Sequence, residues 1–565
     1  MVWNKINYLA AFSLILSIVA CGDDSSSGPN NEPISSSDTE FSSSSKKIDS
    51  TMVIKNKTIS GFAQKGPFKA GSEVKLYELD STTLMQTGRS YSGEIESDDG
   101  KFKIKEVTLA SPYVLLKVSG VYQYVTNNSL RSIDSANYTL NVLTDLRDRD
   151  NVNINLLSHL EYGRILNLVK DGLDISAAKK QAGEEILKAF DIPGNFASED
   201  LNIFGSSEGD AALLATSILM RRNLWDNEFE ELLTDFANDF KKDGKWDSKD
   251  ADATKAKMAD WAAGLDLESI RATIEKLDFV TKAPNFEKYI TQFWTTSYGL
   301  TSCETATHGD VMENKNPLSE TYQANYFCDD DKWRVAHFYE LNDLGKGYFL
   351  NSDIVYDSII DARDGQSYKI VTIGKQTWMA ENLNYADSVT TTSLEGNSWC
   401  FGRKSTNCDL AGRFYSWAAA IDSVSLANDE TNPQECGNGK TCNIPEKWRG
   451  ICPTDWHLPT DEEWETLLTT AGPSNAGKNL KSQHGWQQSG WASTDHYGTD
   501  KYGFSAIPTA TYGSIVDEDD AAYFWSVTQS EEGTVHIMEL WSNNNEAELK
   551  DNYKDKAYSI RCIKD

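Results

Sequence analysis

Positive charge is in short supply in this chain of 565 residues, where 54 Lys and Arg stand against 85 Asp and Glu. Binding of nucleic acid needs clustered Lys and Arg to meet the phosphates, so a formal net charge of -31 argues against a nucleic acid partner. The same excess of acid disfavours electrostatic docking on anionic lipid. After residue 20 there is no long uncharged apolar run, so no later segment is expected to span a membrane.

Motifs that carry catalysis or bind metal are also missing. No CxxC pair occurs and the seven histidines are scattered, so a zinc site is not expected. No serine stands in a Gly-x-Ser-x-Gly setting, which leaves an acyl-transfer triad without its anchor. We therefore expect no catalytic residue, no metal and no cofactor, and we predict that the protein is not an enzyme.

The N-terminus has the pattern of an export signal. Lys5 supplies a positive charge, an apolar run extends from Leu9 to Ala20, and Cys21 follows. The run is shorter than the roughly 20 residues that span a bilayer, and its features are those of a secretory signal peptide. Because it ends in a small residue and a cysteine, it resembles a bacterial lipobox, whose cysteine is acylated. We expect a signal peptide over residues 1–20 and a lipid on Cys21 that anchors the exported protein to the outer membrane or cell surface. An ordinary signal peptide followed by an incidental cysteine is the alternative.

Residues 21–52 are dominated by Ser, Asp and Asn and offer few apolar side chains. Such a composition cannot offset the entropy lost on ordering, so this segment is expected to be a disordered tether. Its role would be to hold the folded body away from the lipid surface.

Cysteine is absent from residues 22–302, and the nine cysteines comprise Cys21 and eight in the C-terminal half. An even number in an exported protein indicates disulfides, although eight cysteines allow about 105 connectivities and the sequence alone does not fix the pairing. Proximity in the sequence favours three pairs and leaves a fourth, long-range one: Cys303–Cys328, Cys400–Cys408, Cys436–Cys442 and Cys452–Cys562.

Residues 53–145 alternate β-rich runs with turn residues, and Asp98-Asp99-Gly100 is typical of a hairpin turn. Regular short strands of this kind predict a small β-sandwich. Gly61 to Phe68, together with Gly100 to Phe102, resembles the prealbumin-like sandwich modules of surface lipoproteins. A solvated turn is favoured over a calcium site at the two aspartates.

Residues 146–300 change to a helical period. Apolar residues recur at i, i+3, i+4, i+7, i+8 and i+11 from Phe229 to Phe240, which describes one face of an amphipathic helix. Ser176 is expected to cap a helix that ends near Phe190. An α-helical domain is therefore predicted. Asp239 to Asp250 resembles a calcium loop, but a lysine at its third position and the lack of a closing glutamate argue against calcium.

Residues 301–350 are expected to form a connector closed by a disulfide. Tyr326 to Val335 is typical of a small hairpin, which Cys303 would close. Beyond it the chain becomes rich in Trp, Gly and Cys, and six motifs follow in order: Gln376–Tyr385, Gly412–Ala420, Cys452–Thr460, Tyr502–Pro508, Phe524–Ser526 and Ser559–Cys562.

This ordered set resembles the Fibrobacter succinogenes major paralogous domain, a family of exported modules without an established activity. The resemblance implies, for residues 351–565, an α+β fold similar to C-type lectins and to the formylglycine-generating, sulfatase-modifying enzymes. It also implies a disulfide between the middle and the end of the module, which Cys452–Cys562 fits. The reactive cysteines of those enzymes are free thiolates, whereas all eight cysteines here have ready partners, so that activity is not expected.

Polar side chains in this module have structural explanations. Thr460 and Glu463 match a capping box at the start of a helix, which is favoured over catalytic carboxylates. His457, between two apolar residues, is expected to be a hydrogen-bonded structural residue. Trp541-Ser542-Asn543 echoes a calcium-dependent lectin only in part, so calcium-mediated sugar binding is not expected.

Aromatic residues are the remaining candidates for ligand binding, since ten of the sixteen tryptophans follow residue 355. Trp486, Trp491 and Tyr497 lie in a polar stretch that suggests exposed loops, where rings can stack on sugar. Four others lie in apolar settings and are expected in the core: Trp378, Trp417, Trp464 and Trp525.

Together these patterns predict a multidomain lipoprotein with a β-sandwich, a helical domain and a disulfide-stapled, C-type-lectin-like domain. We expect a non-catalytic binding or adhesion protein, with polysaccharide or another surface protein as partner. Two alternatives stay open: an enzyme related to sulfatase-modifying or carbohydrate-active proteins, and a purely structural envelope scaffold.

Overall fold

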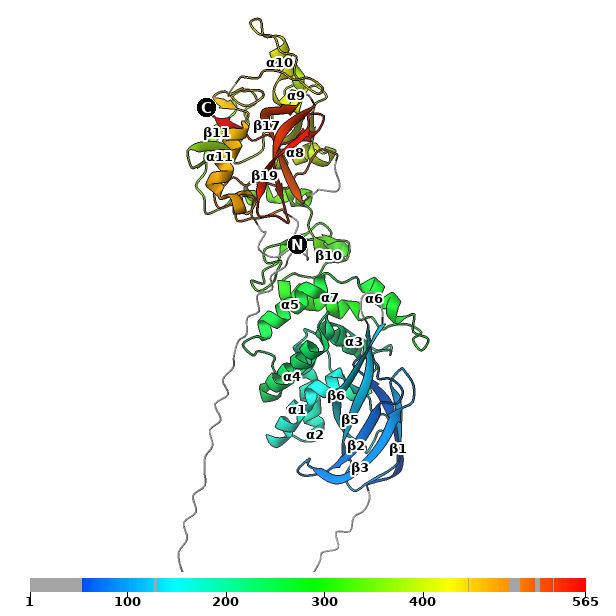
Figure 1. Cartoon of the computed structure of the whole chain (residues 1–565). Helices are drawn as coiled ribbons and strands as arrows, with labels where there is room; N and C mark the ends of the chain where they lie inside the picture. The colour runs from blue at the N-terminus through cyan, green and yellow to red at the C-terminus, as the bar shows by residue number, and fades with distance from the viewer. Residues whose placement is uncertain (1–52, 126–129, 446, 487–497, 514–518, 532) are drawn as a thin grey trace, which may run out of the picture. The chain divides into compact units, whose positions relative to one another are not determined.

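A computed structural model of the chain describes residues 53–125, 130–445, 447–486, 498–513, 519–531 and 533–565 (Figure 1). The predicted signal peptide, the tether and Cys21 lie outside the described residues, as do Trp491 and Tyr497. No helix in the described ranges combines the length and the apolar character that crossing a membrane requires.

Seven strands near the N-terminus form one sheet, in the order β6-β5-β2-β3-β4-β1-β7. Their bounds are β1 (Ile54–Gln64), β2 (Glu73–Leu79), β3 (Gln86–Ile95), β4 (Lys101–Leu109), β5 (Tyr113–Val125), β6 (Leu130–Asp145) and β7 (Ile154–Asn155). A β-rich N-terminal part is confirmed, but the strands of the predicted β-sandwich are paired in one continuous sheet rather than in two. The predicted turn at Asp98-Asp99-Gly100 joins β3 to β4, and the Asp99 carboxylate accepts hydrogen bonds from Ser97 and Lys101.

Seven helices follow the sheet in the sequence. They are α1 (Leu156–Lys170), α2 (Ile175–Lys188), α3 (Glu208–Arg221), α4 (Asp226–Asp243), α5 (Ala251–Ala263), α6 (Leu267–Ile274) and α7 (Glu287–Tyr298). The predicted apolar stripe is confirmed on α4, where Phe229, Phe236 and Phe240 are fully buried. The predicted cap at Ser176 is wrong: Asp174 caps α2 by accepting a hydrogen bond from the Ala177 amide. A carboxylate there also complements the positive end of the helix dipole.

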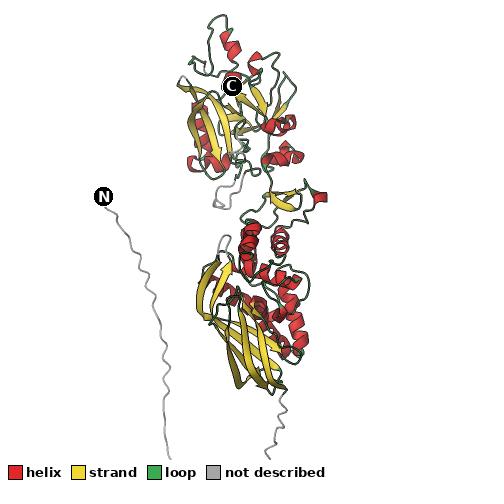
Figure 2. Ribbon diagram, turned by 90° about the vertical axis from the view of Figure 1, so that its right-hand side faces the viewer, coloured by secondary structure: helices red, strands yellow, loops and turns green. Residues whose placement is uncertain are grey.

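The first two helices, α1 and α2, pack on the sheet and so do not belong to a helical domain separate from it. Leu115 on β5 and Leu143 on β6 share an apolar cluster with Ile165 on α1 and Ala178 on α2, and Figure 2 shows helices gathered along one side of the large sheet. The sheet also extends past the predicted boundary at residue 145, because β7 pairs in parallel with β1.

The connector contains three short antiparallel strands: β8 (Val311–Glu313), β9 (Asn325–Asp329) and β10 (Lys332–Val335). β9 and β10 form the predicted hairpin, and Cys303 closes it by bonding Cys328. Cys328 and Trp333 are buried in the core cluster of the helices, so this disulfide lies against the helical core.

The C-terminal module contains three small sheets, with strand orders β11-β12-β13-β21-β16, β14-β15-β20 and β17-β18-β19. The strands are β11 (Asp357–Ile360), β12 (Ser367–Ile373), β13 (Gln376–Met379), β14 (Ser398–Cys400), β15 (Arg413–Ser416), β16 (Trp456–His457), β17 (Ala521–Glu531), β18 (Thr534–Trp541), β19 (Ala547–Tyr553), β20 (Ala557–Tyr558) and β21 (Ile563–Lys564). The helices are α8 (Ser405–Ala411), α9 (Trp417–Ala420), α10 (Ser423–Ala427), α11 (Asp461–Ala471) and α12 (Ala476–Leu480). Sheets thus dominate this α+β module.

The four tryptophans predicted to form its core are all fully buried: Trp378, Trp417, Trp464 and Trp525. The rings of Trp378 and Trp464 stack with their centroids 4.6 Å apart. Arg561 is also fully buried and donates to Asn382 Oδ1 and to the carbonyls of Met379, Phe504 and Ser505. Burial lowers the pKa of Arg561 to about 9, so these acceptors are what make its burial tolerable.

All four predicted disulfides are confirmed: Cys303–Cys328, Cys400–Cys408, Cys436–Cys442 and Cys452–Cys562. The last closes a loop of 110 residues and joins the end of the module to its middle. Every cysteine after Cys21 is therefore used in a cross-link.

Candidate functional site

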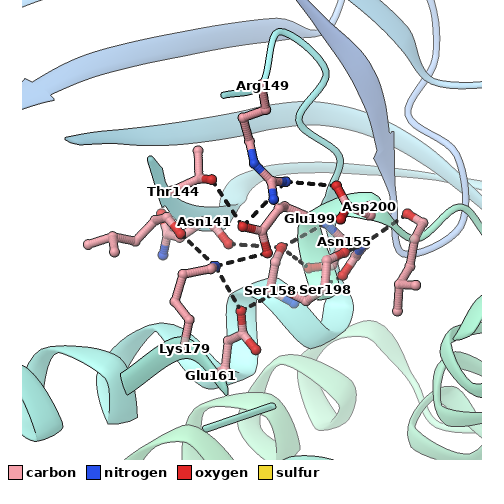
Figure 3. A network of polar contacts seen from close by, with 12 residues as sticks. Asn141, Thr144, Arg149, Asn155, Ser158, Glu161, Lys179, Ser198, Glu199 and Asp200 are labelled. Atoms are coloured by element: carbon pink, nitrogen blue, oxygen red, sulfur yellow. Dashed lines mark hydrogen bonds and ion pairs between the residues drawn. The ribbon is translucent and has the colours of Figure 1, made fainter. Parts of the chain in front are cut away.

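A network of buried charges lies where β6, α1 and α2 meet, next to the short helix η1 (Ser198–Asp200) (Figure 3). Lys179 Nζ lies 3.0 Å from a carboxylate oxygen of Glu199 and 3.4 Å from one of Glu161, and it donates to the Leu143 carbonyl. Arg149 adds a second cation, 3.4 Å from Glu199. The side chains of the two glutamates are only 2% and 3% exposed, whereas those of Lys179 and Arg149 are 14% and 26% exposed, so two buried acids are paired with two partly buried cations.

Hydroxyl groups hold the carboxylates in place. Thr144 on β6 donates to Glu199 at 3.1 Å, and Ser198 donates to Glu161 at 2.5 Å. Arg149 bonds Asp200 at 2.7 Å, which ties the loop after β6 to η1. Each acid of the network therefore has a donor besides Lys179, which is the condition under which buried charges are stable.

Two side chains at the start of α1 fix the position of η1. Asn155 caps the helix through a reciprocal capping box with Ser158, and its amide nitrogen also donates to the carbonyls of Ser198 and Leu201. The segment that carries Glu199 is thus held against the helix that carries Glu161.

The environment moves the pKa values of the two glutamates in opposite directions. Burial disfavours the charged form of both, and at Glu161 it outweighs the attraction of Lys179 and raises the pKa. At Glu199 burial also acts upward, but Lys179 and Arg149 together outweigh it and lower the pKa. Burial acts to lower the pKa of Lys179, and the two glutamates outweigh it and raise the pKa. Lys179 and Glu199 are therefore the ion pair at the centre of the cluster.

The network borders a cavity of about 580 Å³. Its walls come from Tyr113 at the start of β5, from Ile175 and Ser176 at the start of α2, and from Phe196 before η1. This volume lies within the range of small-molecule sites, which is roughly 300–1,000 Å³. The cavity and its charged floor are the strongest candidate for a functional site in the described part of the chain.

No motif in the sequence indicates this site. Its one signal lies in α1, where Glu161 interrupts an apolar stripe that runs from Leu157 and Leu160 to Ile165 and Leu168, all buried. A charged residue at a buried stripe position requires a partner, but the sequence does not say which one. Lys179 and Glu199 come from other elements and could not be assigned to it.

The aromatic residues predicted as a weak ligand site are described only in part. Trp486 is half-buried, and its indole N–H donates to the Ala506 carbonyl at 3.0 Å and to Ser482 at 3.1 Å. Trp491 and Tyr497 lie outside the described residues. The stacking site therefore stays a prediction, with one of its three rings hydrogen-bonded within its own module.

One cluster of Ser, His and Asp in the C-terminal module is arranged differently from a catalytic triad. Asp461 lies between the other two residues: it accepts from Ser526 Oγ at 2.7 Å and pairs through its other oxygen with His536 Nδ1. A serine nucleophile needs the histidine directly beside it to take its proton. The cluster instead ties the start of α11 to β17 and β18. Across the described residues, no group of three His, Cys, Asp or Glu side chains is placed to hold a metal ion.

His457 is hydrogen-bonded through both ring nitrogens, in line with the prediction. The predicted capping box of Thr460 and Glu463 is present at the start of α11, and Glu463 also lies 2.9 Å from His457 Nε2. On the other side of the ring, Asp565 lies 2.7 Å from Nδ1. Burial acts against the imidazolium, but the two carboxylates together outweigh it and raise the pKa of His457.

We expect the stability of the C-terminal module to fall as pH rises through neutrality. A raised pKa means that the contribution of His457 is complete below its ordinary value of 6.5 and is lost as pH rises through the folded-state value. Melting temperatures between about pH 5.5 and 8.5 should fall by roughly 3 °C on this account, and His457→Gln should remove this part of the slope, leaving the contributions of Asp500 and Lys481, whose pKa values burial moves to about 7. His308→Gln, at a half-exposed histidine of the connector, is the matched control and should keep it. An unchanged slope in His457→Gln would contradict the assignment.

The fold is that of a multidomain protein with a β-rich N-terminal part, central helices and C-terminal sheets cross-linked by disulfides. The family model described as Fibrobacter succinogenes major domain matches residues 371–564. The chain therefore carries this domain at its C-terminal end, as the ordered motifs predicted. No curated protein and no solved structure matches the chain.

Proposed function

We propose that this is an exported protein, acylated on Cys21 and held to the outer membrane or cell surface by that lipid, whose folded body binds polysaccharide or another surface protein without catalysis. The observation that carries the proposal is the use of all eight cysteines after Cys21 in four disulfides. Disulfides form and persist in oxidising compartments outside the cytosol. This fits the export pattern of residues 1–20, and the net charge of -31 leaves lipid as the means of attachment.

The paired cysteines also favour binding over the enzyme hypothesis. A sulfatase-modifying type of oxidase acts through reactive thiolates, and a cysteine in a disulfide has no thiol to ionise. The C-type-lectin-like fold implied by the motifs belongs to this proposal as well: the small sheets of the module and the closure of its end by Cys452–Cys562 are compatible with it.

Replacing the acylated cysteine should release the protein from membranes. We expect Cys21→Ser, expressed from the full chain in a bacterial host, to move most of the protein from the membrane pellet to the soluble fraction and to abolish labelling by a fatty-acid analogue. Each buried CH₂ of an acyl chain contributes about 0.8 kcal/mol to membrane binding, so loss of the lipid removes the anchor. Ser36→Ala, in the same tether, is the matched control. Membrane association of Cys21→Ser at the unaltered level would refute the lipid anchor.

A further inference from the structure

The cavity beside the charge network has a floor whose charges already compensate one another. Lys179 has three N–H groups, and three acceptors surround it: Leu143 O at 2.8 Å, Glu199 at 3.0 Å and Glu161 at 3.4 Å. Arg149 lies between Glu199 and Asp200. A charged ligand would lose its hydration there without finding an unpaired counter-charge on the floor, and that loss costs several kcal/mol. The floor therefore disfavours ions, and two lining charges that lie outside this network, Asp148 and Lys180, are exposed.

Hydrogen-bonding capacity nevertheless remains around the cavity. Among the described residues, Arg149 uses only its Nη1 group in these contacts, which leaves Nε and Nη2 as donors. The Ser176 hydroxyl makes no hydrogen bond within the same residues and is both a donor and an acceptor. Asp148, also in the lining, offers acceptors. A ligand that both donates and accepts would be matched by this set.

Apolar surface completes the lining. The rings of Tyr113 and Phe196 are half-buried, so part of each is accessible, and Ile175 is buried beside them. Rings of this kind cover the C–H face of a ligand, while the polar groups meet its hydroxyls. About 580 Å³ is enough for a ligand of one or two sugar rings by the usual range of small-molecule sites.

We propose that this cavity binds a small neutral saccharide, with its hydroxyls on Arg149 and Ser176 and its apolar face against Tyr113 and Phe196. The proposal rests on the binding function proposed above and assigns it a place in the N-terminal part of the chain. A saccharide is neutral, carries hydroxyls that donate and accept, and has C–H faces, which are the three properties that the floor, the remaining donors and the rings select.

The test is calorimetric titration of the mature full chain with neutral disaccharides: cellobiose, maltose, xylobiose and N,N′-diacetylchitobiose. We expect at least one to bind, and Phe196→Ala to weaken its affinity at least tenfold. Ser176→Ala removes only an exposed hydroxyl on a helix that favours alanine, so it should fold normally and weaken binding about threefold to tenfold. Tyr553→Ala, at an exposed ring of the C-terminal module, is the matched control and should leave binding unchanged.

Three outcomes would overturn the inference. The first is that no disaccharide binds. The second is that citrate or lysine binds in competition with the sugar, which would show a site for ions. The third is sugar binding that both cavity variants retain and Trp486→Ala removes. This last result would place the sugar in the C-terminal module and leave the proposed function intact. The lipid anchor is tested separately, by the membrane association of Cys21→Ser.

Discussion

Removing the long-range disulfide should destabilise the C-terminal module by about 5 kcal/mol. The change is the double substitution Cys452→Ala and Cys562→Ala, which opens a loop of 110 residues. The cost follows from the loop-closure entropy that the cross-link removes from the unfolded chain, which grows with the logarithm of loop length. Guanidinium unfolding followed by tryptophan fluorescence reports mainly on this module, because ten of the sixteen tryptophans follow residue 355.

The matched control is the short disulfide of the same module. Cys436→Ala with Cys442→Ala opens a loop of only 6 residues, so the same relation gives about 2 kcal/mol. Chemical reduction should affect the part over residues 53–300 only through Cys303–Cys328, which packs on its helical core, since that part contains no cysteine of its own. Equal losses in the two double variants would contradict the long-range role of Cys452–Cys562.

The two buried glutamates of the charge network should respond very differently to the same substitution. We expect Glu199→Gln to cost about 3–5 kcal/mol, because it leaves the buried Lys179 without its ion-pair partner. Glu161→Gln should cost less than about 1 kcal/mol, because Lys179 keeps Glu199 as its ion-pair partner and an amide oxygen can still accept from Ser198. The measurement is the free energy of unfolding of the N-terminal part, from urea titration at pH 7.

The pH dependence of the two variants gives an independent check. Glu199 has a lowered pKa, so its contribution is present above its ordinary value of 4.5 and is lost as pH falls through the folded-state value. Glu161 has a raised pKa, so its contribution is complete below 4.5 and is lost as pH rises through the folded-state value. The free energy of unfolding of Glu161→Gln should therefore increase relative to that of the unaltered protein as pH rises. Similar losses of stability for both substitutions would contradict the opposite pKa shifts assigned to the two acids.

Features that depend on neighbouring residues could be predicted from the sequence. The apolar stripe from Phe229 to Phe240 and the capping box of Thr460 and Glu463 are set within one to three helical turns, and the short-range disulfides follow from proximity. The cap of α2 was missed because Asp174 and Ser176 are both good capping residues, and only the structure shows which one accepts the amide.

Long-range arrangements could not be predicted in the same way. β7 has only two residues, too few for alternation to be visible, and its pairing with β1 spans about 90 residues of sequence. The charge network depends on the same packing, since Glu161, Lys179 and Glu199 meet only because α1 and α2 lie on β6. By contrast, the identity of the C-terminal module could be predicted, because its motifs occur in a fixed order.

The parallel pairing of β7 with β1 has a consequence for how such chains diversify. A recombination break at residue 145 would remove β7 from the sheet and would expose Leu115 and Leu143, which α1 and α2 cover. Each fragment would then have an exposed apolar surface prone to association. The sheet, α1 and α2 are therefore expected to be exchanged between genes only as one unit.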